Sequence, residues 1–235
     1  GRDLKDGSDL GTLLRQLATV DGIRWIRLHY AYPIGLPEGL LRAIAEEEKV
    51  CSYIDIPLQH ASGPMLKAMR RGVTRSGQER ILERIRHYIP DVTIRTTFIV
   101  GFPGETDEDF RVLTDFVRSQ RFDRVGVFTY CKEDGTPAAT LPRQVADEVK
   151  EERQASLMQL QAKISHERLE RHLGQRMEVL VDGPSEEHPL VKVGRMATQA
   201  PEVDGIVFID EAPEPLSPGD FTSVEISKVT DHDLV

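Results

Sequence analysis

Polar side chains stand directly after several apolar segments of this sequence, at points where strands would end. Gln59 and His60 follow a run of Ile-Pro-Leu, and Tyr130 follows Val-Phe-Thr. Arg71 lies one predicted helix beyond Gln59, where its guanidinium could pair with the carboxylate of a ligand. Each feature also has a structural explanation, because Gln-His after a strand often supports the backbone and paired arginines often end a helix in solvent. The residue types alone leave both roles open.

A glycine-rich turn lies between these segments. Gly101-Phe102-Pro103-Gly104 connects an apolar run to Thr106, which is typical of a tight turn from a strand into a helix. Amides in such a turn are free to face a ligand. The turn is not a phosphate-binding P-loop, because no Gly-Lys-Ser/Thr follows it, and it lacks the spacing of a dinucleotide-binding motif. By itself it indicates only a generic connection.

The sequence contains 2 cysteines, Cys51 and Cys131. They cannot form a disulfide framework, which favours a reducing cytoplasm. They are also too few for the four ligands of a structural zinc site or for the three or more that an iron–sulfur cluster needs. No base or redox motif accompanies either one, so we interpret both as incidental thiols.

Strand and helix patterns alternate over the first two-thirds of the chain. Strands are predicted at 23–30, 53–58, 93–100 and 125–130, and helices at 9–20, 36–49, 62–71, 75–88 and 106–117. This alternation predicts right-handed βαβ units and a parallel sheet. Four strands cannot close an eight-stranded barrel, so we expect an α/β, partial (open) TIM-like barrel with an exposed edge. Parallel strands put their loops at one edge, so those near Gln59, Gly101 and Tyr130 should converge around a nucleoside-sized hollow.

The pattern changes after a long predicted helix at 145–173. Short strands separated by turns are predicted at 176–182, 190–196, 205–210 and 221–229. This spacing is typical of a small antiparallel barrel. We therefore predict two domains, the partial barrel with its connecting helix at 1–167 and an all-β domain at 168–235. The sequence contains no apolar run of about 20 residues, so we predict no membrane-spanning helix.

The two predicted domains differ in charge. Residues 168–235 contain 6 Lys and Arg against 14 Asp and Glu, a net of −8. The first 167 residues contain 24 Lys and Arg against 25 Asp and Glu, a net of −1. The two parts sum to the total of −9. An acidic domain disfavours a phosphate backbone and favours a basic partner. The alternative is an acidic surface that only keeps the protein in solution.

Four segments in this order resemble the radical S-adenosylmethionine (SAM) methylthiotransferases. They are Ile56-Pro57-Leu58-Gln59, Leu66-Lys67-Ala68-Met69-Arg70-Arg71, Ile99-Val100-Gly101-Phe102-Pro103-Gly104-Glu105-Thr106, and the segment from Tyr130 through Gly135-Thr136-Pro137-Ala138. The acidic C-terminal part resembles the TRAM domain of that family, which is a small β-barrel. The resemblance covers essentially the whole chain.

Three details resemble the RimO type, the branch that methylthiolates an aspartate of a small-subunit ribosomal protein. They are Asp55-Ile56-Pro57-Leu58-Gln59-His60-Ala61, Met69-Arg70-Arg71-Gly72, and Gly194-Arg195 followed by Ala200-Pro201-Glu202-Val203-Asp204-Gly205. The tRNA-modifying branch usually has a Gln-Ser-Gly-Ser type of sequence where Gln59-His60-Ala61-Ser62 stands here. The acidic C-terminal domain agrees with a basic protein substrate rather than tRNA.

The resemblance implies that the parent protein uses SAM and two 4Fe-4S clusters. In the family, reductive cleavage of SAM gives a 5′-deoxyadenosyl radical, which abstracts hydrogen from the substrate β-carbon before the methylthio group is attached. Both cluster sites would lie upstream of Gly1, so we expect no cluster, no metal ligand and no catalytic residue in this chain, which should be inactive alone. The resemblance assigns SAM binding to Gln59, Arg71, Thr97, Gly101, Tyr130 and Thr136.

The resemblance and the charge together predict a basic small-subunit ribosomal protein as the partner of the acidic TRAM domain. We expect no membrane association, a cytoplasmic location, and no nucleic acid as direct substrate. Two alternatives stay open. One is a tRNA methylthiotransferase of the same superfamily, which a basic TRAM face would favour. The other is a non-enzymatic module that presents the acidic domain to a basic partner.

Overall fold

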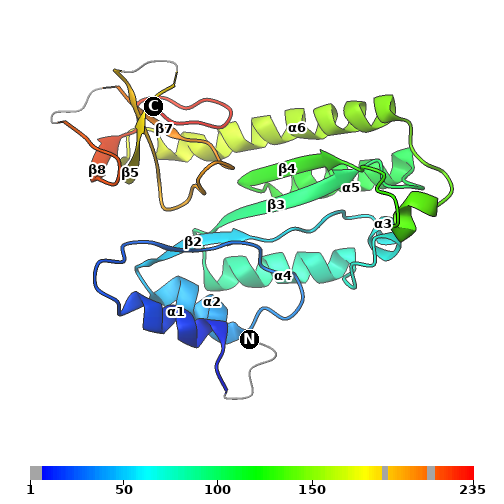
Figure 1. The fold of residues 1–235 in the computed structure, drawn as a ribbon, viewed down its shortest axis with the longest axis horizontal. Coiled ribbons are helices and arrows are strands. Elements are labelled where there is room, and N and C mark those ends of the chain that lie inside the picture. Colours follow the sequence, from blue (N-terminus) through cyan, green and yellow to red (C-terminus); the bar gives the residue numbers. More distant parts are fainter. Residues whose placement is uncertain (1–6, 187–189, 211–214) are drawn as a thin grey trace.

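The computed structural model describes residues 7–186, 190–210 and 215–235. Its first part contains α1 (Leu10–Ala18), β1 (Ile26–Leu28), α2 (Glu38–Glu46), β2 (Val50–Asp55), α3 (Gly63–Ala68), α4 (Arg75–Tyr88), β3 (Thr93–Val100), α5 (Asp107–Gln120), β4 (Arg124–Thr129), the 3-10 turn η1 (Pro137–Thr140) and α6 (Asp147–Leu169). A second 3-10 turn, η2 (Glu170–His172), leads into β5 (Arg176–Pro184), β6 (Lys192–Arg195), β7 (Val207–Ile209) and β8 (Phe221–Glu225). Figure 1 shows the course of the chain.

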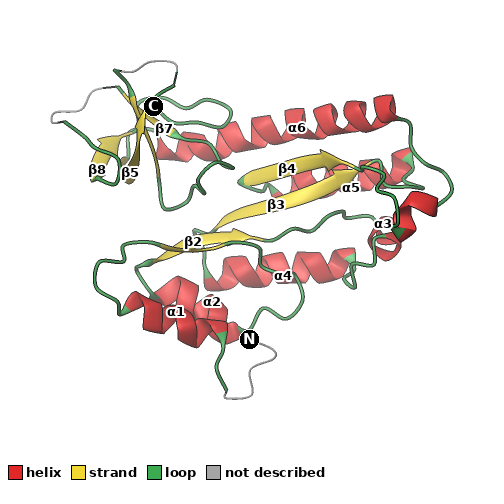
Figure 2. Ribbon diagram, in the orientation of Figure 1, coloured by secondary structure: helices red, strands yellow, loops and turns green. Residues whose placement is uncertain are grey.

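Strands β1 to β4 form one parallel sheet in their sequence order. The described residues give β1 and β4 no partner on their outer sides, so the sheet is an open part of a barrel, as the sequence predicts. Its core contains residues from the strands and from α2, α4, α5 and α6. Figure 2 shows these helices around the strands.

The two faces of the sheet differ in burial. Along β3, Ile94, Phe98 and Val100 are buried against the helices, whereas Thr97 and Ile99 between them are only half-buried. The β3–β4 register pairs Thr97 with Gly126 and Ile99 with Phe128, so these four residues share the other face, called the inner face below. A parallel sheet normally buries both faces, so the exposure of the inner face follows from the incomplete barrel.

Local signals explain why several elements match the sequence prediction. Thr106 caps α5 in a capping box with Asp109, which ties down the first turn of this helix. The predicted bounds of α4 and β3 are those of the structure. The second strand is different: β2 runs from 50 to 55 instead of 53 to 58, because its pairing with β1 begins at Val50. Cys51 therefore lies within this strand and not before it.

Strands β5 to β8 form the C-terminal β-domain, an antiparallel sheet in the order β7-β6-β5-β8. Single bridges join Leu234 to Val207 and to Val229, so the C-terminus connects β7 to the segment that follows β8. The core of the domain contains Val179, Val181 and also Leu169 from the end of α6. Three of the counted acidic residues, at 187, 211 and 214, lie outside the described residues.

Helix α6 connects the two domains and lies beside β4 (Figure 1). Gln154 and Gln161 on this helix donate side-chain hydrogen bonds to the carbonyls of Val127 (2.7 Å) and Phe122 (2.9 Å). These bonds satisfy two backbone acceptors, one within β4 and one just before it. Both lie along the edge of β4 at which no further described strand pairs. None of the described helices is long and apolar enough to cross a membrane.

Candidate functional site

The loops that follow β2, β3 and β4 lie next to one another at the carboxyl edge of the parallel sheet. Gln59 donates its N–H to the Thr97 carbonyl (2.8 Å) and accepts from the Ile99 N–H (2.9 Å), so the loop after β2 stays attached to β3. Tyr130 donates its N–H to the Val100 carbonyl (2.8 Å), directly before the glycine turn. The Phe102 and Tyr130 rings meet edge to face with centroids 5.2 Å apart.

Gln59 has a backbone conformation that places strain at this edge. Its φ of 69° lies in the left-handed region, which costs a non-glycine residue about 1–3 kcal/mol unless its surroundings fix it. Hydrogen bonds on both sides do so, because Gln78 Nε2 donates to the carbonyls of Leu58 (3.1 Å) and His60 (2.9 Å). Strain that is fixed in this way is typical of functional sites.

Arg71 lies close to the end of β2. Its Nη2 donates to the Pro57 carbonyl (3.0 Å), and its guanidinium lies over the Tyr32 ring at 5.2 Å from the centroid. The buried Nε of Arg71 has no hydrogen-bond partner in the described part of the chain. In the sequence Arg71 lies one helix after Gln59, and the fold brings its side chain back to the carboxyl end of β2.

Gly101 is the tightest point of the edge. Its φ is 73°, and a Cβ there would lie 2.2 Å from Cγ of Lys150 on α6. The Gly101 N–H donates to Glu105, which closes the turn. The ammonium of Lys150 lies 5.7 Å from the centroid of the Tyr130 ring, so this lysine packs between two of the loops.

Unused polar groups gather at this edge. The buried Tyr130 hydroxyl has no hydrogen-bond partner in the described chain. Neither the Gln59 amide nor the Thr97 hydroxyl makes a side-chain hydrogen bond to any described residue, and both residues are half-buried. Phe128 on the inner face is 59% exposed although it is a large apolar residue. Polar groups without partners beside an exposed aromatic ring fit a ligand that has both a base and polar substituents, as SAM has.

Thr136 differs from the other predicted residues. Its hydroxyl donates to the Glu133 carbonyl (2.7 Å) and accepts from the Ala139 N–H (3.3 Å), so it caps η1. Both bonds are local, and the structure records no contact between Thr136 and Gln59, Thr97 or Gly101 among the described residues. The structure thus groups Gln59, Arg71, Thr97, Gly101 and Tyr130 at one edge and gives Thr136 a capping role.

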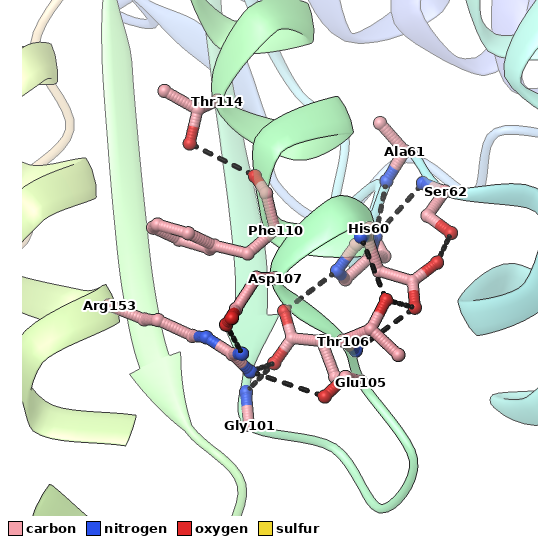
Figure 3. A network of polar contacts seen from close by, with 11 residues as sticks. His60, Ala61, Ser62, Gly101, Glu105, Thr106, Asp107, Phe110, Thr114 and Arg153 are labelled. Atoms are coloured by element: carbon pink, nitrogen blue, oxygen red, sulfur yellow. Dashed lines mark hydrogen bonds and ion pairs between the residues drawn. The ribbon is translucent and has the colours of Figure 1, made fainter. Parts of the chain in front are cut away.

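A buried ionic network behind these loops escaped the sequence analysis. His60 Nε2 lies 3.1 Å from Glu105, and Arg153 Nη1 lies 3.0 Å from the same carboxylate. Figure 3 shows that the loop after β2, the glycine turn and α6 each contribute one of these side chains. Arg153 lies 48 positions after Glu105, so no local pattern could have paired them.

The two thiols differ in burial. Cys51 is buried in β2, and this burial raises the pKa of its thiol, whereas Cys131 is exposed directly after Tyr130. Across the described ranges, no group of three or more His, Cys, Asp or Glu side chains is placed to hold a metal ion.

Comparison with known proteins adds independent findings. Residues 2–117 match the radical SAM superfamily, and residues 173–235 match the TRAM domain. The chain is 48% identical to the ribosomal protein uS12 methylthiotransferase RimO of Pelobacter propionicus and 47% identical to that of Geobacter sulfurreducens. Both alignments cover 100% of this chain and 52% of the relative, so the chain spans about half the length of the curated relatives it matches.

The solved structures give a weaker match. The radical SAM methyltransferase TsrM from Kitasatospora setae, with cobalamin and a [4Fe-4S] cluster bound, is 19% identical with a TM-score of 0.46. The match covers 55% of this chain and 26% of TsrM.

Proposed function

This chain belongs to the RimO family of radical SAM methylthiotransferases, and from that premise we propose that it is the carboxyl-terminal half of such an enzyme. The longer protein that would contain it is called the parent protein below. We propose that the parent attaches a methylthio group to the β-carbon of an aspartate in ribosomal protein uS12, in the cytoplasm where ribosomes are found. Its cofactors would be SAM and two 4Fe-4S clusters, with neither cluster on this chain.

The observation that carries the proposal is the grouping at the carboxyl edge of the open barrel. Gln59, Thr97 and Tyr130 come from three adjacent strands, and each presents a polar group that the described chain does not use. The carboxyl edge is where α/β barrels place their active sites, because the loops diverge there. Hydrogen-bonding groups without partners at this edge support its assignment as half of a SAM pocket.

The residues of this chain would divide the binding of SAM between them. The Arg71 guanidinium suits the carboxylate of the methionine moiety, because a guanidinium matches a carboxylate in charge and geometry. The Gln59 amide and the Thr97 hydroxyl suit the amino group or the ribose, and Tyr130 and the Gly101 turn would flank the adenosine. Bound SAM supplies the radical that activates the substrate carbon. The loops keep the ligand in place and exclude water from it.

The C-terminal β-domain would bind the partner protein away from the reacting residue. Its net charge of −8 over residues 168–235 favours a basic ribosomal protein. However, this domain packs at the amino ends of the strands, with Tyr53 and Arg95 contacting Asp204. Strand β3 has 8 residues, so the two ends are separated by about 25 Å at 3.3 Å per residue. The acidic domain would therefore contact the body of the partner while one aspartate reaches the carboxyl edge.

The division between this chain and the parent predicts where iron binds. We expect iron and acid-labile sulfide at the level of two 4Fe-4S clusters in the anaerobically reconstituted parent, and none in the 235-residue chain. The reason is that cysteine thiolates hold such clusters and this chain has only 2 cysteines. Iron analysis and visible absorption of both proteins measure this. Mass spectrometry of uS12 should then detect a methylthio group only with the parent.

Two results would contradict the proposal. A cluster on the 235-residue chain alone would show that other ligands hold it. Tight, salt-sensitive tRNA binding by the parent, without modification of uS12, would favour a tRNA substrate instead, because phosphate contacts weaken steeply with added salt.

The Tyr130 hydroxyl gives a prediction for a single residue. Tyr130→Phe removes a hydroxyl that has no partner in the described chain, so the free energy of unfolding should change by less than about 1 kcal/mol. If the hydroxyl binds SAM, the Kd of SAM for the parent should rise about 2- to 10-fold, the value of one neutral hydrogen bond. Chemical denaturation and equilibrium dialysis with SAM measure the two effects. Tyr88→Phe is the matched control, because it also removes one tyrosine hydroxyl but lies at the end of α4, outside the edge loops, and should leave this Kd unchanged.

A further inference from the structure

The His60–Glu105–Arg153 network behind the carboxyl edge is buried and joins three segments. The side chains of His60 and Glu105 are 0% exposed and that of Arg153 is 8% exposed. One Glu105 oxygen contacts His60 at 3.1 Å. The other accepts from the Gly101 N–H and from Arg153 at 3.0 Å. Arg153 also reaches Asp107 (2.7 Å), so its guanidinium spans the start of α5 (Figure 3).

The hydrogen bonds of His60 determine where its ring proton lies. Nδ1 accepts from the N–H groups of Ala61 and Ser62, each at 2.9 Å, so this nitrogen carries no proton. Nε2 must then carry the proton and donate it to the Glu105 carboxylate. The imidazole thus connects the backbone after β2 to the side chain that closes the turn after β3.

We propose that His60 and Arg153 are positioning residues for the SAM site: through Glu105 they fix the Gln59 loop and the Gly101 turn relative to each other. This inference rests on the proposed function, because it assigns the network to the pocket between those loops. Both loops have positive φ, 69° at Gln59 and 73° at Gly101. Sheet hydrogen bonds hold Gln59 to β3, and Ser62 donates to Asp109 in the first turn of α5. Among the described residues, only the Glu105 network ties the loop after β2 to the Gly101 N–H.

Arg153 extends this role to a helix outside the barrel strands. It lies on α6, beyond the residues 2–117 that match the radical SAM superfamily. The same helix places Lys150 against Gly101 and continues into the core of the C-terminal β-domain through Leu169. The connecting helix therefore carries part of the support of the cofactor site as well as linking the domains.

The test compares two replacements of Arg153 with a control on the same helix. Arg153→Gln removes the charge that compensates Glu105, whereas Arg153→Lys keeps the charge but loses the planar fork that reaches both carboxylates. Leu157→Ala, one turn further along α6, creates a cavity in the fully buried core without touching the network. It should lower stability while leaving the site geometry in place.

Two measurements distinguish positioning from general stability. Hydrogen–deuterium exchange of the 235-residue chain should show faster exchange at 99–106 in both Arg153 variants, but not in Leu157→Ala. Equilibrium dialysis of the reconstituted parent should show the Kd of SAM raised at least tenfold by Arg153→Gln and by a smaller factor for Arg153→Lys. Leu157→Ala should keep the Kd within about twofold of the unchanged parent, under conditions where the protein is folded.

The outcomes are separable. If the unchanged parent binds no SAM, the proposed function fails while the exchange comparison still tests the network. If the parent binds SAM and Arg153→Gln leaves both the Kd and the exchange at 99–106 unchanged, the inference is overturned. It is also overturned if Leu157→Ala raises the Kd as much as Arg153→Gln, because loss of stability would then explain both.

Discussion

Asp204→Ala should lower the free energy of unfolding by about 3 kcal/mol, because it leaves buried donors without an acceptor. The Asp204 side chain is 1% exposed. It accepts from the Tyr53 hydroxyl (2.8 Å) and the Ala200 N–H (2.8 Å), and it lies 3.5 Å from Arg95. Burial and the Asp204 carboxylate raise the pKa of the Tyr53 hydroxyl, so it stays protonated and donates.

Urea denaturation measures this effect, with Glu225→Gln as the control. Glu225 is also an acidic residue of the C-terminal β-domain, but it is 64% exposed and 4.0 Å from Arg176, so its loss should cost less than about 0.5 kcal/mol. Because Asp204 joins the two domains, we also expect the alanine variant to unfold less cooperatively. Equal midpoints for the two variants would show that this contact does not hold the domains together.

Gly101→Ala should lower stability by about 2–4 kcal/mol, because the alanine adds both backbone strain and a clash. The φ of 73° disfavours any side chain, and the new Cβ would lie 2.2 Å from Cγ of Lys150. The new Cβ fits only if the Lys150 side chain changes its rotamer or the turn moves away from α6. We therefore expect the Kd of SAM for the parent to rise at least tenfold.

Gly174→Ala separates strain from crowding. Its φ of 72° matches that of Gly101, but a Cβ there would have no atom within 4 Å. This variant should cost only about 1–2 kcal/mol and should leave SAM binding unchanged. Denaturant titration and SAM dialysis of both variants give the comparison. A Gly101→Ala protein that binds SAM as the unchanged parent does would remove the glycine turn from the proposed pocket.

The place of the acidic domain changes how partner binding must be understood. Charge alone favoured a basic partner but gave no position for it. The contacts of Tyr53 and Arg95 with Asp204 put this domain at the amino ends of the strands, whereas Gln59 and Tyr130 lie at their carboxyl ends. Under the proposed function, a partner that meets both the acidic domain and the carboxyl edge must be large or extended.

Local sequence patterns were sufficient for most elements of the fold. Helix α4 and strand β3 have the predicted bounds, because capping at Thr74 and alternation along β3 depend only on neighbouring residues. Strand β2 was misplaced by three residues, since its start depends on pairing with β1. The predicted position of Cys51, before this strand, was wrong for the same reason. Pairing is a property of two segments and cannot be read from one.

The sequence by itself predicted the α/β order, the acidic C-terminal region and the position of the loops near Gln59, Gly101 and Tyr130 at one edge of the sheet. Parallel strands impose that last result, because residues after successive strands must share an edge. Only the tertiary structure decided that Arg153 reaches Glu105 across 48 positions and that Asp204 joins Tyr53 across 151. Contacts between distant segments form only when the core brings the segments together, and no local pattern encodes them.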